Sequence, residues 1–205
     1  MSEPIALPRR RKSVRRAEIL AAAREVFSDK PFEAASVSEI ARRAGCVEGT
    51  LYTYFLNKRD LFDSVLADFY DQLIADIEPR FDAIADTQAR LCFLVARHLR
   101  IALDDPAVGR LIAREVRGQG GYFGSKLHTL NRRYSRFLLT TLADGVARGE
   151  LRADLDAGLA RDLLFGGLEH VVMNQLDRRK PFDPDELAAR IVAMVLQGWR
   201  AGSPS

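Results

Sequence analysis

The sequence predicts an all-α protein in which a small N-terminal helical head is joined to a larger helical body. Apolar residues recur at intervals of three and four along most of the chain, and strand-like alternation is nearly absent. Capping residues, glycines and prolines separate these periodic stretches. The chain has 205 residues, 47% of them hydrophobic, which permits a sizeable core. We place the head in residues 1–57 and the body in residues 58–205.

Local signals place the ends of the first helices. Pro31 stops the first helix, because proline has no backbone N–H to donate. Ser36 and Glu39 form a capping box, in which the Ser36 hydroxyl meets the Glu39 amide and the Glu39 carboxylate reaches back. Gly45 ends the short helix behind Ser36, and Asn57 caps a long one. About nine helices are expected in total. Besides the short helix behind Ser36, they cover residues 13–29, 48–55, 58–80, 86–104, 106–117, 124–148, 156–178 and 184–200.

Composition argues against a membrane protein. The chain has no run of 18 or more apolar residues, so no segment is long enough to span a bilayer. Its basic N-terminus lacks the apolar stretch of a secretory signal. The two cysteines, Cys46 and Cys92, fit neither a disulfide framework nor a zinc pattern. We therefore expect a cytoplasmic protein with no metal, cofactor or membrane partner.

The positive charge of the chain is concentrated at its N-terminus. Residues 1–16 hold six basic groups and one acid, whereas the other 189 residues hold 25 basic and 27 acidic groups. The six basic residues are Arg9, Arg10, Arg11, Lys12, Arg15 and Arg16. Such a run is either a solvated tail or an arm that binds nucleic acid, and the charge pattern alone leaves both open.

Two short helices joined at Gly45 follow the helix-turn-helix plan. In the second of them, residues 48–55, the inward face is Val47, Leu51 and Phe55, which leaves hydroxyls and aromatic rings outside. A surface of this kind suits DNA, because hydroxyls donate to phosphates and threonine methyls touch thymine methyls. The outward residues of this helix are Glu48, Gly49, Thr50, Tyr52, Thr53 and Tyr54.

The segment SVSEIARRAGCVEGTLYTYFLNKRDLF resembles the DNA-binding segment of the tetracycline-repressor (TetR) family. The family pattern G-V-x-x-G-T-L-Y-x-Y/H-F-x-x-K is matched at Gly45, Gly49, Thr50, Leu51, Tyr52, Tyr54, Phe55 and Lys58. The sequence departs from it at Cys46, at Val47, where a capping residue is common, and at Glu48, where many members have lysine. The expected DNA-binding residues are Arg9, Arg10, Arg11, Lys12, Ser36, Ser38, Glu48, Gly49, Thr50, Tyr52, Thr53, Tyr54 and Lys58.

The last two expected helices, residues 156–178 and 184–200, are apolar on more than one side. Ordinary packing within the chain explains many such stripes. The resemblance implies instead a homodimer in which this pair of helices forms a four-helix bundle, and reading a palindrome also requires a dimer. Gly166 and Gly167 lie in mid-helix, which suggests a close backbone approach. The expected interface comprises Leu164, Leu168, Val171, Val172, Ile191, Met194 and Val195.

The helices of residues 86–148 are expected to enclose any ligand. His98 lies on an apolar face, where it is either a core residue or a ligand group. Two arginine pairs, Arg97 with Arg100 and Arg114 with Arg117, are either solvated or part of an anion clamp. The body also resembles, more loosely, the acyl-CoA-responsive regulators of fatty-acid degradation within the family. The expected effector-binding residues are Leu91, Val95, His98, Arg110, Arg114, Arg117, Phe137, Leu138 and Leu142.

These features and the resemblance predict a ligand-responsive transcriptional repressor. It would bind palindromic double-stranded operator DNA as a homodimer and be released by a small hydrophobic effector, for which long-chain acyl-CoA is the candidate. Two alternatives stay open: a DNA-binding regulator without an effector, and a multidrug-sensing repressor of an efflux gene. An enzyme is not expected, because no nucleophile–base spacing, glycine-rich phosphate loop or metal set occurs in the sequence.

Overall fold

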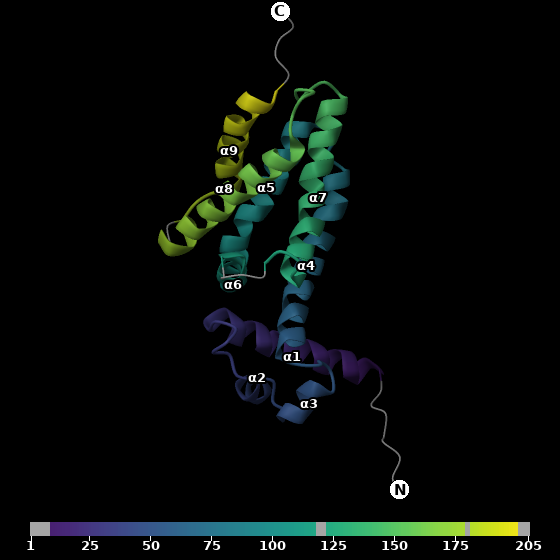
Figure 1. The fold of residues 1–205 in the computed structure, drawn as a ribbon, viewed down its shortest axis with the longest axis vertical. Coiled ribbons are helices and arrows are strands. Elements are labelled where there is room, and N and C mark those ends of the chain that lie inside the picture. Colours follow the sequence, from purple (N-terminus) through teal and green to yellow (C-terminus); the bar gives the residue numbers. More distant parts are fainter. Residues whose placement is uncertain (1–8, 118–121, 179–180, 201–205) are drawn as a thin grey trace, which may run out of the picture. The chain divides into compact units, whose positions relative to one another are not determined.

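The computed structural model describes residues 9–117, 122–178 and 181–200, and these confirm the all-α fold (Figure 1). Their helices are α1 (Arg9–Asp29), α2 (Val37–Arg43), α3 (Glu48–Tyr52), α4 (Lys58–Asp82), α5 (Thr87–Asp104), α6 (Pro106–Arg117), α7 (Lys126–Ala147), α8 (Ala157–Arg178) and α9 (Pro184–Trp199). The chain forms two compact units, residues 1–69 and 70–205. The division falls inside α4, whereas the sequence places it just before this helix. Across the described residues, every helix falls short of the length and apolar character that a bilayer-spanning helix needs.

An aromatic cluster holds the first unit, here called the head, together. The ring of Phe62 on α4 meets Phe27 of α1 edge-on at 5.0 Å and Phe32 at 5.2 Å between centroids. Ile40 of α2 and Leu51 of α3 are also buried, so every helix of the head contributes to this core. Aromatic pairs in such edge-to-face geometry add stability beyond their buried area. The short helices α2 and α3 therefore depend on this packing rather than on their own length.

The capping box at α2 forms only in part. The Ser36 hydroxyl accepts the Glu39 backbone N–H at 3.5 Å, as expected. The Glu39 carboxylate does not return to Ser36 but binds the Lys30 ammonium at 2.6 Å. The hydrogen bond from Lys30 lowers the pKa of Glu39. A charged partner from the preceding segment competes better for this carboxylate than a backbone amide does, because a charge-assisted hydrogen bond is stronger.

The boundaries of α1 and α3 differ from those expected. Helix α1 begins at Arg9, so Arg9 to Lys12 belong to a helix rather than to a separate arm. Helix α3 ends at Tyr52. The backbone then turns, and Phe55 donates its N–H to the Leu51 carbonyl at 2.9 Å. Asn57 caps α4 as predicted, accepting the N–H of Asp60 at 2.9 Å.

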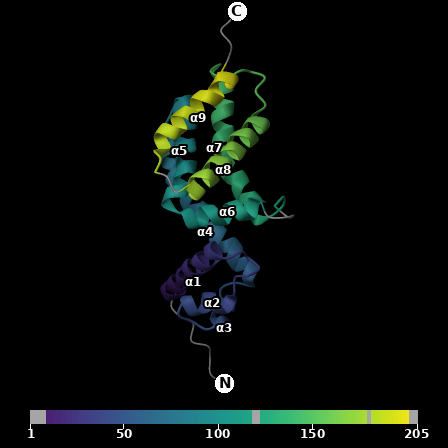
Figure 2. The same cartoon turned by 90° about the vertical axis from the view of Figure 1, so that its left-hand side faces the viewer.

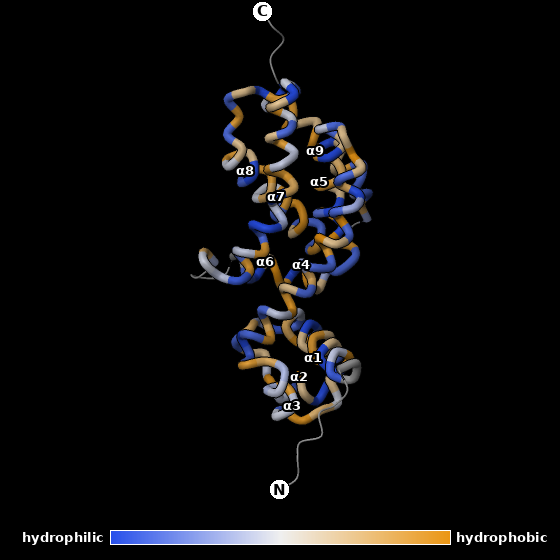
Figure 3. The backbone as a smooth tube through the Cα atoms, turned by 90° about the vertical axis from the view of Figure 1, so that its right-hand side faces the viewer, coloured by the Kyte–Doolittle hydropathy of each residue, from blue (hydrophilic) through white to orange (hydrophobic). Residues whose placement is uncertain are grey.

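In the second unit, here called the body, α5 is the central helix (Figure 1). It packs against α7, α8 and α9, and α9 runs beside it in the orthogonal view (Figure 2). Apolar and polar stretches alternate along the body helices (Figure 3), as the periodicity predicts. Arg152 donates its backbone N–H to the Trp199 carbonyl at 2.9 Å, which ties the segment after α7 to the end of α9.

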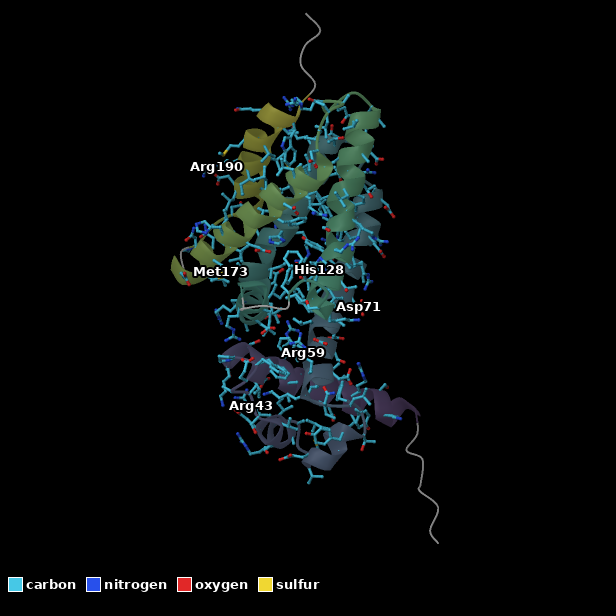
Figure 4. The ribbon with its side chains drawn as sticks, viewed as in Figure 1. Arg43, Arg59, Asp71, His128, Met173 and Arg190 are labelled. Carbon is cyan, nitrogen blue, oxygen red and sulfur yellow. The ribbon has the colours of Figure 1, made fainter. Side chains whose placement is uncertain are left out.

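Ion pairs join the body helices at their edges. Arg90 of α5 binds Asp144 of α7 at 2.7 Å, and Arg100 of α5 binds Asp185 of α9 at 2.5 Å. Asp71 of α4, labelled in Figure 4, pairs with Arg133 of α7. The Arg100–Asp185 and Asp71–Arg133 pairs are exposed, and such pairs contribute little individually. The apolar core between the helices therefore supplies most of the stability of the body.

Gly45 allows a direct test of the turn between α2 and α3. Its φ is +64°, a conformation that costs a residue with a Cβ about 1–2 kcal/mol. We expect Gly45→Ala to lower the free energy of unfolding by that amount, measured by urea denaturation. Gly49→Ala is the matched control, since Gly49 is helical and a Cβ there has nothing within 4 Å. Equal stability of the two variants would show that the turn does not depend on the left-handed glycine.

Candidate functional site

The outer face of α3 carries the residues that the sequence assigns to DNA. Tyr52 is 52% exposed, and Thr53, Gly49 and Glu48 are exposed beside it. Leu51 faces the other way and is 1% exposed. Among the described residues, nothing lies within 4 Å of a Cβ built on Gly49, so a backbone can approach α3 closely there.

Several hydroxyl groups on this face already take part in hydrogen bonds within the head. Ser36 caps α2, and the Thr53 hydroxyl donates to the Gly49 carbonyl at 3.1 Å. Ser38 of α2 donates its hydroxyl to the Glu48 carboxylate. This bond spans the turn and holds Glu48 toward α2, although Val47 at the N-cap makes no side-chain capping bond. Glu48 thus stabilises the start of α3 from the other side of the turn.

Several cations of the head have structural partners. Lys58 donates to the Glu33 carbonyl at 3.3 Å and lies 4.5 Å from the centre of the Phe32 ring. Arg15 donates to the Ala44 carbonyl at 3.2 Å, at the end of α2. Arg43, labelled in Figure 4, binds Glu25 at 3.3 Å. The side chains of Arg9, Arg10 and Arg11 lie outside the described residues, and Lys12 is exposed.

Two exposed apolar side chains adjoin the α3 face, against expectation. Val47, which the sequence places on the inward face with Leu51 and Phe55, is 73% exposed, and Leu56 is 86% exposed. They flank α3 on its N-terminal and C-terminal sides. No signal in the sequence marks them, because exposure of a single apolar residue in a turn depends on packing that periodicity does not report.

The body contains a cavity of about 530 Å³. This volume lies in the range of small-molecule sites. Helices α4 to α8 and the segment before α7 contribute to its wall. The lining residues are Tyr70, Leu73, His98, Ile101, Gly109, Ile112, Ala113, Tyr122, Phe123, His128, Asn131, Arg132, Tyr134, Ser135, Arg161, Asp162, Phe165, Gly166, Glu169 and Val172.

A hydrogen-bonded chain of side chains crosses part of the cavity wall. The Tyr70 hydroxyl donates to the Asn131 side-chain carbonyl, and the Asn131 amide donates to the Tyr122 hydroxyl at 2.8 Å. Burial raises the pKa of Tyr70. His128, labelled in Figure 4, lies in the first turn of α7 and accepts the Gly124 N–H at 3.2 Å. These contacts hold the segment before α7 against the cavity.

A second cluster joins His98 of α5, Tyr134 of α7 and Phe165 of α8. The His98 ring stacks on Tyr134 with 6.0 Å between centroids and lies 5.4 Å from Phe165. Burial lowers the pKa of His98 to about 4, so its imidazole is neutral at pH 7. Burial also raises the pKa of Tyr134, which keeps the phenol protonated.

Among the predicted effector residues whose side chains the structure describes, His98 alone lies at the cavity wall. Leu91, Val95, Leu138 and Leu142 are buried in the core, at 0%, 1%, 1% and 0% exposure, and none of them lines the cavity. Phe137 packs on Phe81 at 5.1 Å. Arg110 and Arg114 do not line the cavity, and the side chain of Arg117 lies outside the described residues.

The cations at the cavity wall are instead Arg132 of α7 and Arg161 of α8. Arg161 binds the neighbouring Asp162 at 2.7 Å, and Arg132 is exposed. Both occur among several arginines with the same local pattern, so periodicity could not select them. Arg97 and Arg100 serve as structural pairs: Arg97 binds Asp76 at 2.8 Å and Asp104 at 3.2 Å, and Arg100 binds Asp185.

The residues predicted for the dimer interface divide between two faces. Leu164, Leu168 and Val172 are buried in the chain's own core, with 5%, 2% and 7% exposure. Met194 of α9 is 73% exposed, and Val171, Ile191 and Val195 are half-buried. Leu159 and Leu163 of α8, which were not predicted, are 56% and 64% exposed. The outward apolar face of α8 is therefore displaced from the predicted one.

Comparison with known proteins agrees with this architecture. Residues 19–65 match the bacterial regulatory proteins of the tetR family, and residues 66–198 match the C-terminal region of YsiA-like proteins. A fatty acid metabolism regulator protein of Bacillus subtilis is 26% identical over 181 residues, 88% of this chain and 93% of the relative. The HTH-type transcriptional repressor KstR2 of Rhodococcus jostii is 31% identical over 157 residues, 73% of this chain and 74% of the relative.

Solved structures are similar over nearly the whole chain. The regulator FadR of Bacillus subtilis, in complex with stearoyl-CoA, has a TM-score of 0.82 at 26% identity and covers 89% of this chain and 98% of its own. The fatty acid degradation regulator FadR of Bacillus halodurans has a TM-score of 0.80 at 28% identity, over 90% of this chain and 99% of its own. With its helix-turn-helix head and helical body, this chain belongs to the tetR family of bacterial regulatory proteins and is a DNA-binding transcriptional regulator, not an enzyme.

Proposed function

We propose that the protein is a repressor that binds palindromic operator DNA as a homodimer and is released by a hydrophobic effector of the long-chain acyl-CoA type. The cavity of about 530 Å³ in the body carries this proposal, because a regulator without an effector has no need of a large cavity lined by aromatic and apolar side chains. The similarity to a FadR that binds stearoyl-CoA supports the acyl-CoA class.

DNA contact is assigned to the α3 face with help from the first turn of α1. Tyr52 presents half of its side chain to solvent, and Gly49 leaves room for a phosphate. Four consecutive basic residues, Arg9 to Lys12, begin α1. Phosphate contacts of this kind supply affinity, and base contacts in the major groove supply specificity. The Glu48 carboxylate keeps its negative charge, and the Ser38 hydroxyl that donates to it holds it toward α2.

Two substitutions test the DNA surface on an operator fragment selected from random DNA. Replacing Arg9 to Lys12 by glutamine keeps the helix but removes the charge. The slope of log K against log salt should then flatten by about 0.9 for each phosphate that these side chains neutralise in the wild type. Tyr52→Ala should weaken binding without lowering thermal stability, and Tyr52→Phe, its control, separates the hydroxyl from the ring. An unchanged salt slope would show that the basic turn does not touch DNA.

The dimer is assigned to the outward face of α8 and α9. Leu159, Leu163 and Gly166–Gly167 recur at intervals of three and four on α8, so they form one stripe. Among the described residues, nothing lies within 4 Å of a Cβ on either of these two glycines, and Gly166 also borders the cavity. Two glycines in mid-helix cost about 1 kcal/mol each relative to alanine, which a close helix from a second copy would justify. Met194 extends the exposed apolar surface onto α9.

Leu163→Glu tests this interface because its side chain is 64% exposed in the single chain. We expect a folded monomer, detected by light scattering at micromolar concentration, that binds the palindrome poorly. Leu168→Glu is the contrasting control: Leu168 is 2% exposed, so a charge there should destabilise the body itself. A wild-type chain that is monomeric at micromolar concentration would contradict the assignment.

The acyl chain is assigned to the apolar part of the cavity and the anionic end of a CoA thioester to Arg132 and Arg161. Each buried methylene adds about 0.8 kcal/mol, so affinity should rise with chain length until the cavity is filled. Tyr70 and Leu73 of α4 line the cavity, and Phe62 of the same helix belongs to the head core. We propose that a ligand displaces α4 and thereby moves the two recognition helices of a dimer from the roughly 34–36 Å spacing of successive major grooves.

Titration of stearoyl-CoA, free stearate and a neutral hydrophobic drug into the operator complex tests the effector. Stearoyl-CoA should release DNA, and operator DNA should weaken its binding by the same factor. The double variant Arg132→Ala/Arg161→Ala should lose roughly tenfold or more in affinity for stearoyl-CoA, whereas the charge-matched Arg110→Ala/Arg114→Ala should not.

The other outcomes of this titration decide between the remaining functions. Release by the drug alone would assign the protein to the multidrug-sensing repressors, and release by none of the three compounds would leave a regulator without an effector of these classes. Loss of stearoyl-CoA binding only in the Arg110/Arg114 variant would place the anion site on α6 instead of at the cavity wall.

A further inference from the structure

Two polar atoms at the cavity wall are buried without a hydrogen-bond partner in the described part of the chain. They are the Tyr134 hydroxyl and Nδ1 of His98. The rings that carry them stack with 6.0 Å between centroids, so the two atoms belong to one cluster. Tyr134 is 5% exposed. Most buried polar side-chain atoms in proteins have a partner, and each exception calls for an explanation.

The surrounding side chains, among those that the structure describes, do not offer a partner. Phe165, which contacts both rings, is apolar. The neighbouring Tyr70 hydroxyl is committed to Asn131, and the Asn131 amide to Tyr122. The positive charge of Arg97 acts to lower the pKa of Tyr134, but the Arg97 guanidinium binds Asp76 and Asp104. Tyr134 and His98 thus both line the cavity and carry hydrogen-bonding groups that the described residues leave without a partner.

We propose that Tyr134 and His98 form a binding site for one neutral oxygen, a hydroxyl or a carbonyl, within an otherwise apolar effector. This inference rests on the proposed function in that it takes the cavity as the effector site. A carbonyl oxygen can accept from the Tyr134 O–H and from a protonated Nδ1 of His98. A hydroxyl can accept from Tyr134 and donate to an unprotonated Nδ1, so either tautomer of the imidazole serves one of the two groups.

The charge state of the cluster favours a neutral oxygen over a carboxylate. His98 is uncharged at pH 7 because burial lowers its pKa to about 4, and the Tyr134 phenol stays protonated. A carboxylate here would be desolvated without a cation to compensate, which is strongly unfavourable. The arginines of the wall, Arg132 and Arg161, are the groups for an anionic end. The site therefore separates two functions, charge recognition by arginine and recognition of a neutral oxygen by the Tyr134–His98 pair.

The test compares naphthol with naphthalene, a pair that differs only in one hydroxyl and does not depend on acyl-CoA. Dissociation constants are measured by calorimetry for the full-length wild type and for Tyr134→Phe. The ratio of the two constants should change by roughly tenfold between these proteins, since hydrogen bonds of this kind contribute a factor of that order. Tyr134→Phe should be at least as stable as wild type without ligand, because the hydroxyl that it removes has no partner.

Tyr70→Phe is the matched control in the same cavity. It removes a hydroxyl that already has a partner, so it should leave the naphthol-to-naphthalene ratio close to that of wild type. His98→Phe should change the ratio in the same direction as Tyr134→Phe. A wild-type ratio that Tyr134→Phe leaves unchanged would overturn the proposal, as would an equal change in Tyr70→Phe.

Stearoyl-CoA and its thioether analogue S-octadecyl-CoA, which lacks the carbonyl oxygen, then identify the source of the oxygen. Weaker binding of the thioether to wild type, with no difference in Tyr134→Phe, would assign the site to the thioester carbonyl. Tighter binding of a hydroxystearoyl-CoA than of stearoyl-CoA, abolished in Tyr134→Phe, would assign it to a chain hydroxyl. Failure of every CoA compound to bind would refute the proposed acyl-CoA function, and the naphthol comparison would still decide on the oxygen site.

Discussion

Helix α4 has to bury apolar side chains in two different cores, and most other features of the chain depend on that constraint. Its first half places Phe62 between Phe27 and Phe32 in the head. Its second half places Tyr70 and Phe81 against Tyr134 and Phe137 of α7 in the body. Each half of α4 is thus held by its own close-packed core, and such cores resist gradual deformation. This shared helix is the element through which, under the proposed function, binding in the body would influence DNA contact by the head.

The head and the body differ in how far their polar side chains are hydrogen-bonded. In the head, charged and polar groups have local hydrogen-bond partners: Lys30 donates to Glu39, Ser38 to Glu48, and Arg15 to the Ala44 carbonyl at the end of α2. These contacts make a small unit with short helices well defined, which suits a surface that must fit DNA without rearranging. In the body, the Tyr134–His98 pair is left without partners among the described residues, beside a cavity. Unsatisfied groups lower the stability of the unliganded body and are available to a ligand.

Helix α8 has apolar side chains both in the core and on its outer surface. One side of this helix places Leu164, Leu168 and Val172 in the core, and another side exposes Leu159, Leu163 and the two glycines. An apolar stripe that the chain does not cover is unfavourable in water unless something else covers it. Phe165 and Gly166 of α8 also line the cavity, so this helix borders both the cavity and the exposed stripe. A ligand that moves α8 would alter both.

The sequence by itself determined the helical class, most helix ends and the location of the DNA-binding segment. These features depend on local chemistry: the left-handed Gly45, the caps at Ser36 and Asn57, and the period of apolar residues are all written within a few neighbouring positions. Only the tertiary structure decided which face of α8 is buried, that Glu39 binds Lys30, and that Arg132 and Arg161 rather than Arg110 and Arg114 line the cavity. Leu91, Val95 and Arg110 have the same kind of pattern as residues that do line it. Periodicity shows that a residue faces inward, but the crossing of helices decides whether it meets another side chain or the cavity.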